Sequence, residues 1–244
     1  MTSRTAGLRA GSPIRANWIF SLLTGTRMGE PALNPAVLDV IDRLPDLYDV
    51  PGLIPSISTI APKGSEGFFA RLAEIKHSRF GQGRFQLQFS IHSSDEQTRA
   101  RLIPMPHWSF PEISAYGERF AEAEDRKITL NFALAEGIPI EAFELRRHFD
   151  PGRFLIKVTP INPTLRAAAS GLRSRVDASH PERTYGELQA LEDAGFDVLL
   201  SIGELEENRI GSNCGQFVQR ILHGSRSEQH PVGSYTYWHP QNAS

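Results

Sequence analysis

Cysteine is almost absent from this sequence, since among 244 residues only Cys214 occurs. A single thiol cannot form a disulfide framework, and it cannot by itself supply the ligands of a structural zinc site or an iron–sulfur cluster. It can act as a nucleophile, carry a transferred group, or fill a small space in the core. Cys214 is therefore a candidate functional residue whose surroundings decide its role.

The sequence also has little excess charge and no long hydrophobic run. Its formal net charge of -2 argues against binding nucleic acid through bulk electrostatics, although a local basic patch stays open. No segment approaches the roughly 20 apolar residues of a membrane-spanning helix. The first 29 residues hold four arginines and no acid, which weakly resembles a transit peptide, but a frayed polar N-terminus is favoured. We expect a cytoplasmic protein with no membrane partner.

Strand and helix patterns alternate along the chain, which is typical of a parallel sheet covered by helices. In Phe85–Ile91 apolar and polar residues alternate with period two, which suits a barrel strand whose other side faces a polar lumen. The expected strands are Trp18–Leu23, Leu53–Ser58, Phe85–Ile91, Lys127–Leu134, Phe154–Pro160 and Asp197–Ser201.

Helix signals fall between these strands. Asn34 before Pro35 is a favourable N-cap and first-turn pair, and Ser109 with Glu112 and Thr184 with Glu187 form capping boxes. The expected helices hold Val37–Leu44, Phe68–Ile75, Ser109–Ala123, Ile138–His148 and Thr184–Ala194. We divide the chain into a frayed N-terminus (1–17), one incomplete barrel domain (18–223) and a flexible tail (224–244).

Polar residues follow the ends of these strands, where barrels of this kind gather their chemistry. Each signal is weak by itself, because Gly-Glu-Pro is usually a turn and a strand-end Ser or His usually serves the surface or a cap. Their shared edge is what predicts one site. The candidates in chain order are Gly29, Glu30, Ser58, Ser90, Ile91, His92, Asn162 and Cys214.

The order of these motifs resembles the radical S-adenosylmethionine (SAM) methyl synthases, which methylate C2 or C8 of an adenine in ribosomal RNA and, in some members, in transfer RNA. The likeness covers about Trp18 to Ile221 and implies a partial (β/α)6 radical-SAM-type barrel that lacks its first strand. The motifs are Gly29-Glu30-Pro31 with Asn34, Ser58-Thr59, Ser90-x-His92, Arg-x-x-Leu/Ile-x-Pro, Pro-x-Asn162-Pro and Cys214-Gly-Gln.

The resemblance implies a role for each candidate. Glu30, with Gly29, would bind the amino group of SAM, Ser58 and the run Ser90–His92 (with Ile91) would line its pocket, and Asn162 would hold it from the last barrel strand. Cys214 would carry the methyl group as S-methylcysteine before a 5′-deoxyadenosyl radical activates it. Ribosomal or transfer RNA would be the substrate, a 4Fe-4S cluster the second cofactor, and flavodoxin or ferredoxin the electron donor.

The chain departs from this family in one decisive feature. The cluster motif Cys-x-x-x-Cys-x-x-Cys is expected before Gly29-Glu30-Pro31, where the chain has only Met1–Asn17, and the family's second catalytic cysteine and general-base glutamate are missing too. We therefore expect this chain alone to be inactive and poorly soluble, either as an incomplete reading frame or as a homologue without chemistry.

Two alternatives belong to other classes. A thiol hydrolase or transferase would use Cys214 as nucleophile and His92 as base, which requires hydrogen-bond reach between them. A non-catalytic RNA-binding or regulatory protein would use the arginine-rich loop Leu165–Arg183 and the stretch Pro104–Trp108.

Overall fold

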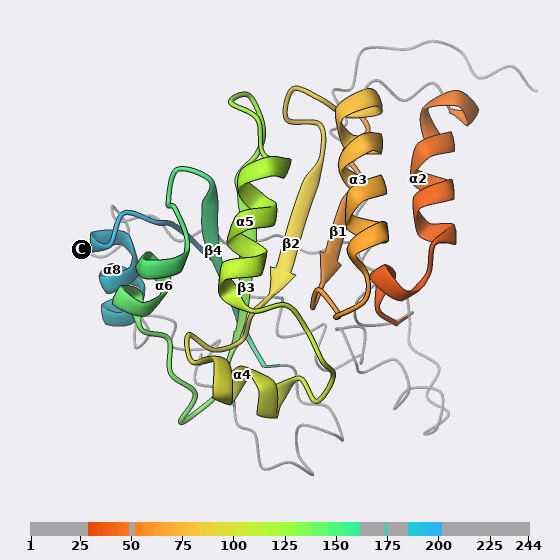
Figure 1. Ribbon diagram of the computed structural model, residues 1–244. Helices are drawn as coiled ribbons and strands as arrows, with labels where there is room; N and C mark the ends of the chain where they lie inside the picture. The colour runs from red at the N-terminus through yellow and green to blue at the C-terminus, as the bar shows by residue number, and fades with distance from the viewer. Residues whose placement is uncertain (1–28, 49–51, 162–173, 175–184, 202–244) are drawn as a thin grey trace, which may run out of the picture.

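The computed structural model describes residues 29–48, 52–161, 174 and 185–201, which form a parallel sheet with helices (Figure 1). Its strands follow sequence order, β1-β2-β3-β4-β5, and every neighbouring pair is parallel. An order that never reverses is the arrangement of a β/α-barrel wall rather than of a doubly wound sheet. The strands are β1 Ser56–Thr59, β2 Gln86–Ser90, β3 Ile128–Leu134, β4 Phe154–Pro160 and β5 Asp197–Leu200.

The predicted α/β fold is confirmed, and five of the six expected strands are found within a few residues of their expected bounds. The sixth, Trp18–Leu23, lies outside the described residues, as do the segments 1–17 and 224–244. Among the residues that the structure describes, no helix is long and apolar enough to cross a membrane.

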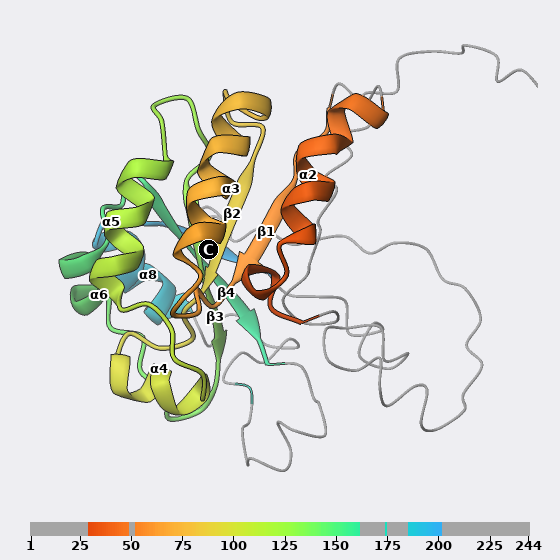
Figure 2. The ribbon, with the colours of Figure 1, turned by 45° about the vertical axis from the view of Figure 1, so that its right-hand side comes forward.

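The helices cover one side of the sheet (Figures 1 and 2). Phe69 of α3 packs on Phe89 of β2 with ring centroids 6.1 Å apart, and Phe149, just after α6, packs on Phe154 of β4 at 5.1 Å. Burying one such side chain contributes about 1.5–3 kcal/mol. The helices are α2 Ala36–Leu47, α3 Glu66–Arg79, α4 Glu96–Leu102, α5 Phe110–Phe120, α6 Ala142–His148 and α8 Tyr185–Asp193, with a 3-10 turn η1 at Pro31–Leu33.

The capping signals within the described residues are confirmed. Asn34 Oδ1 accepts the N–H of Ala36 at 3.1 Å at the start of α2. Glu112 Oε2 accepts both the N–H and the hydroxyl of Ser109 at 2.7 Å, which closes the capping box of α5. These side chains satisfy backbone groups that have no partner within the first turn of a helix.

One helix prediction needs correction, and one helix was missed. The helix expected over Ile138–His148 begins only at Ala142, because the residues before it are tied to the loop after β2: Ser94 donates its N–H to Pro139 O at 3.1 Å and accepts the N–H of Glu141 on its hydroxyl at 2.8 Å. Helix α4 was not predicted. Its start is marked by Asp95, whose Oδ2 accepts the N–H of Thr98 at 2.8 Å.

A glycine lets α5 approach the sheet closely. A Cβ atom on Gly117 would lie 2.3 Å from Cζ of Phe154 and 3.1 Å from Cδ1 of Ile128, both of which are fully buried. One residue earlier, the hydroxyl of Tyr116 donates to Phe69 O at 2.9 Å and joins α5 to α3. Burial raises the pKa of this hydroxyl, so it stays protonated as a donor.

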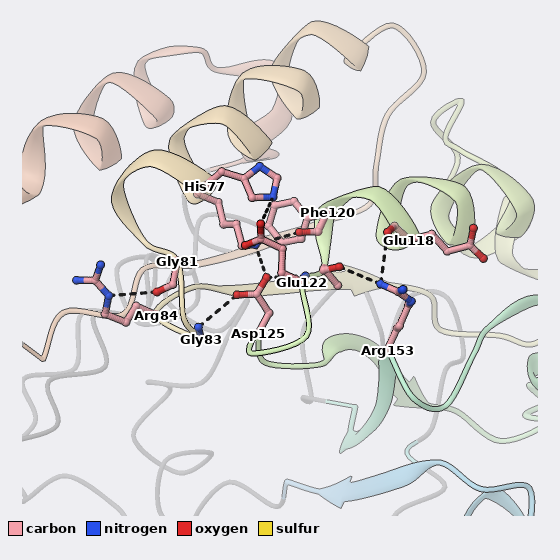
Figure 3. A network of polar contacts seen from close by, with 11 residues as sticks. His77, Gly81, Gly83, Arg84, Glu118, Phe120, Glu122, Asp125 and Arg153 are labelled. Atoms are coloured by element: carbon pink, nitrogen blue, oxygen red, sulfur yellow. Dashed lines mark hydrogen bonds and ion pairs between the residues drawn. The ribbon is translucent and has the colours of Figure 1, made fainter.

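At the amino-terminal end of the sheet a buried lysine joins the ends of α3 and α5. Figure 3 shows the neighbouring residues Phe120, Glu122 and Asp125. Nζ of Lys76, which is 1% exposed, donates to Phe120 O at 3.1 Å and forms ion pairs with Glu122 at 3.0 Å and, more closely, with Asp125. Burial acts to raise the pKa of Asp125, but hydrogen bonds from Lys76 and from backbone N–H groups bring it below its ordinary value. The ammonium is thus fully compensated.

We expect the change Asp125→Asn to lower the free energy of unfolding by about 3 kcal/mol or more, because it leaves the Lys76 ammonium buried without its buried counterion. The matched change Glu122→Gln should cost less than about 1 kcal/mol, because that side chain is 57% exposed. Urea unfolding of both variants at neutral pH measures the difference. Equal costs would contradict the central role of Asp125.

Candidate functional site

Glu30 joins the turn before η1 to the carboxyl end of β1. Its Oε1 accepts the N–H of Ala32 at 3.1 Å and a close hydrogen bond from the Thr59 hydroxyl, and its Oε2 accepts the N–H of Ile60 at 3.0 Å. The preceding Gly29 has a φ of 99°, a left-handed conformation that glycine adopts without strain. The Gly-Glu-Pro run therefore fixes a half-buried carboxylate at the end of the sheet where barrel sites lie.

Arg99 of α4 holds the same loop from its other side. The residue is 0% exposed, and its Nη2 donates to Ile60 O at 3.1 Å while Nη1 donates to Trp108 O at 2.6 Å. Burial lowers its pKa to about 10, so the guanidinium stays charged at neutral pH. Glu30 binds the N–H of Ile60, and Arg99 binds the carbonyl of the same residue. The backbone at the end of β1 is therefore held at both its N–H and its carbonyl group.

His92 lies at the end of β2 with a φ of 65°, an uncommon conformation for a residue with a side chain. Its Nδ1 accepts the N–H of Ala133 at 3.1 Å, which assigns the proton to Nε2 in the neutral ring. Burial, and after it the charge of Arg99, lowers the pKa of His92 to about 4. His92 is therefore neutral at pH 7, and its Nε2–H donor has no partner among the residues that the structure describes.

The other predicted residues lie on two sides of the sheet. Ser58 and Ser90 are half-buried on the side away from the helices, since they alternate with Ile57, Phe89 and Ile91, which are all 0% exposed in the core. Ile91 can therefore contribute to a site only through its main chain.

Some predicted residues cannot be placed. Asn162 and Cys214 lie outside the described residues, and the thiol-hydrolase alternative, which needs Cys214 within reach of His92, stays a prediction. The described residues contain no group of three or more His, Cys, Asp or Glu side chains that could hold a metal ion. In the stretch proposed to contact RNA, Trp108 is a core residue, 6% exposed and 4.3 Å from the Phe69 ring, so it offers no face for base stacking.

Two polar residues on the open side were missed by the sequence analysis, Asn131 of β3 and Lys157 of β4. Both are half-buried, and the register pairs Ser90 with Asn131 and Asn131 with Lys157, so the three form one row across the sheet. The signal was present in the sequence, because both occupy the polar positions of a period-two pattern like that of Phe85–Ile91.

No family model matches the chain. Among curated proteins it is similar to a "Probable dual-specificity RNA methyltransferase RlmN" of Thermobifida fusca, with 25% identity over 219 residues, covering 86% of this chain and 54% of the relative. Proteins of the same description from Desulfitobacterium hafniense (29% identity, 80% and 51% covered) and Synechococcus sp. RCC307 (28%, 82% and 55%) are also similar. The chain is thus similar, at 25–29% identity, to several proteins described as RlmN.

This RlmN-like chain spans about half the length of the curated relatives it matches. The aligned share of the chain, about four fifths, agrees with the extent of the likeness read from the motifs. The relationship therefore covers the described sheet and its polar edge.

The pKa of His92 predicts a loss of stability in acid. An unfolded histidine with a pKa near 6.5 takes up a proton before the folded one with a pKa of about 4, so the contribution is present above pH 6.5 and is lost as the pH falls toward 4. The loss is at most about 3 kcal/mol. Urea unfolding between pH 7 and pH 4 should show this loss of stability in the wild type and in the control His77→Gln. The variant His92→Asn should not show it, and asparagine is chosen because it tolerates the left-handed backbone at this position. The same pH dependence in His92→Asn would contradict it.

Proposed function

We propose that this chain forms the SAM-binding barrel wall of an RlmN-like RNA methyltransferase. The relatives' description as RNA methyltransferases supports the reaction class. The observation that carries the proposal is the carboxyl edge of the sheet, where Glu30, Ser58, Ser90 and His92 lie in sequence order at the ends of adjacent strands β1 and β2. RNA is the proposed substrate.

The residues at this edge fit the polar groups of SAM. Glu30 accepts three hydrogen bonds, and a carboxylate offers about four acceptor positions, so one position stays open for the ammonium of the methionine moiety. The hydroxyl of Ser58 and the Nε2–H of His92 have no partner among the described residues and can bind the ribose or the adenine, and the hydroxyl of Ser90, which also has none there, can bind another polar group of SAM. Asn162 is proposed to complete this set.

The chemistry divides into a part that this chain can hold and a part that it cannot. When bound, SAM supplies the methyl group, and we propose the thiol of Cys214 as its first acceptor. A 4Fe-4S cluster does not fit the residues present, because the chain has one cysteine where such clusters take several thiolates. No radical step is therefore assigned to this chain by itself.

Saturable binding of labelled SAM, measured by equilibrium dialysis, tests the proposal. We expect a Kd of about 1 mM or tighter, which corresponds to about -4 kcal/mol. The change Ser58→Ala should weaken binding without loss of stability, since its hydroxyl has no partner among the described residues. Glu30→Gln should weaken it by about tenfold or more, because it removes a charge-assisted contact.

The matched control is Glu122→Gln, which removes an exposed acid at the opposite end of the sheet and should leave SAM binding unchanged. Urea unfolding of each variant separates loss of binding from loss of folding. A folded wild-type chain that shows no saturable binding, or one whose binding survives both Ser58→Ala and Glu30→Gln, would overturn the proposal.

We also expect the chain, incubated without oxygen with iron, sulfide, dithionite and SAM, to form no 5′-deoxyadenosine, because one thiolate cannot hold the cluster that would reduce SAM. Chromatography of the small-molecule products measures this. Formation of 5′-deoxyadenosine above a Cys214→Ala control would show that this chain holds a cluster after all.

A further inference from the structure

The open side of the sheet divides into a paired part and an unpaired part. Near the amino-terminal ends of the strands the side chains bind one another: Gln86 Nε2 donates to Thr129 Oγ1 at 3.1 Å, and Gln88 Nε2 donates to Ser56 Oγ at 3.2 Å. Such pairing satisfies polar groups that a sheet face would otherwise bury. These residues need no ligand.

One row further toward the carboxyl ends, the pairing stops. Ser90, Asn131 and Lys157 are direct neighbours in register, are all half-buried, and have side chains with no hydrogen-bond or ionic partner among the described residues. Their polar atoms are not among the fully buried, unsatisfied side-chain atoms of the described part. The row thus combines a hydroxyl, an amide and an ammonium, none of which has a side-chain partner in the described part of the chain.

Lys157 is the informative member of this row. It lies in the middle of β4, where burial lowers its pKa, and the described carboxylate that faces the same side one row away, Asp197, is ion-paired with Lys127 at 2.6 Å. A half-buried ammonium without a counterion destabilises a protein. Lys157 has no counterion among the described residues, whereas Lys76 has two. Residues kept at such a cost are typical of binding sites.

We propose that the row Ser90–Asn131–Lys157 binds an oxyanion of a small ligand, with Lys157 as the charge partner and Asn131 and Ser90 as hydrogen-bond donors. The oxyanion is a carboxylate, as in the methionine moiety of SAM, or a phosphate ester, as in a nucleotide. The first source rests on the proposed function, and the second does not.

Two ligand pairs distinguish the sources, because each pair differs only in the oxyanion: SAM against decarboxylated SAM, and adenosine 5′-monophosphate against adenosine. Dissociation constants are measured by equilibrium dialysis or calorimetry for the wild type and Lys157→Met. If the row binds a carboxylate, Lys157→Met weakens the binding of SAM by about tenfold or more and leaves the affinity for decarboxylated SAM unchanged. If the row binds a phosphate, Lys157→Met weakens the binding of adenosine 5′-monophosphate by a similar factor and leaves the affinity for adenosine unchanged.

Lys127→Met is the matched control, since it removes a half-buried lysine of the same side that already has an ion-pair partner. Lys127→Met should not change the affinity for any ligand of the two pairs. Lys157→Met should fold at least as stably as the wild type without ligand, because it removes an unpaired buried charge. Urea unfolding of each variant therefore shows whether a loss of affinity is caused by a loss of folding.

The inference would be overturned if Lys157→Met changed the affinity for neither SAM nor adenosine 5′-monophosphate. If SAM binding depends on Glu30 and Ser58 but not on Lys157, the oxyanion site fails while the proposed function stands. If the monophosphate depends on Lys157 while SAM does not bind, the proposed function fails and the oxyanion site stands.

Discussion

The candidate site depends on the two hydrogen bonds that buried Arg99 donates to carbonyls of separate loops. A guanidinium in the interior is costly. Here the carbonyls of Ile60 and Trp108 bind its two Nη atoms and the ring of Phe110 has its centroid 5.7 Å away, while its buried Nε has no hydrogen-bond partner among the described residues. The same loops pair directly, since Trp108 donates its N–H to Ala61 O at 2.8 Å. The end of β1 thus cannot shift independently of α4 and α5, which gives Glu30 a fixed position against it.

The two sides of the sheet follow from one alternation. A strand residue faces the side opposite to its neighbours, so the apolar set that packs under the helices forces the intervening polar set onto the other side. What differs along that side is the degree of pairing. At the amino-terminal end of the strands, Lys76 is paired with Asp125, whereas the side chains of Ser90 and Lys157 have no partner in the part of the chain that the structure describes. Stability is concentrated at one end, and binding capacity toward the other.

Most of the fold could be predicted from the sequence, because period-two runs such as Phe85–Ile91 and capping pairs such as Ser109 with Glu112 depend only on local chemistry. Glu30 was found because its motif is short and contiguous. Lys157 was missed because its role depends on its cross-strand neighbour Asn131, which the sequence does not place beside it. Arg99 was missed because its acceptors are backbone carbonyls, which residue types do not reveal. The start of α6 was wrong because contacts with Ser94 override the apolar pattern.

The charge of the chain constrains how any anionic ligand can be recognised. With a formal net charge of -2 the chain as a whole gives no bulk electrostatic attraction for RNA or nucleotides, so recognition depends on local groups. Recognition must come from short-range contacts in places where water is partly excluded and a single ammonium interacts strongly. On the described sheet the row that contains Lys157 meets both conditions, because its polar neighbours are free and its burial is partial. A nearly neutral chain can therefore still be selective for an oxyanion, through position rather than through total charge.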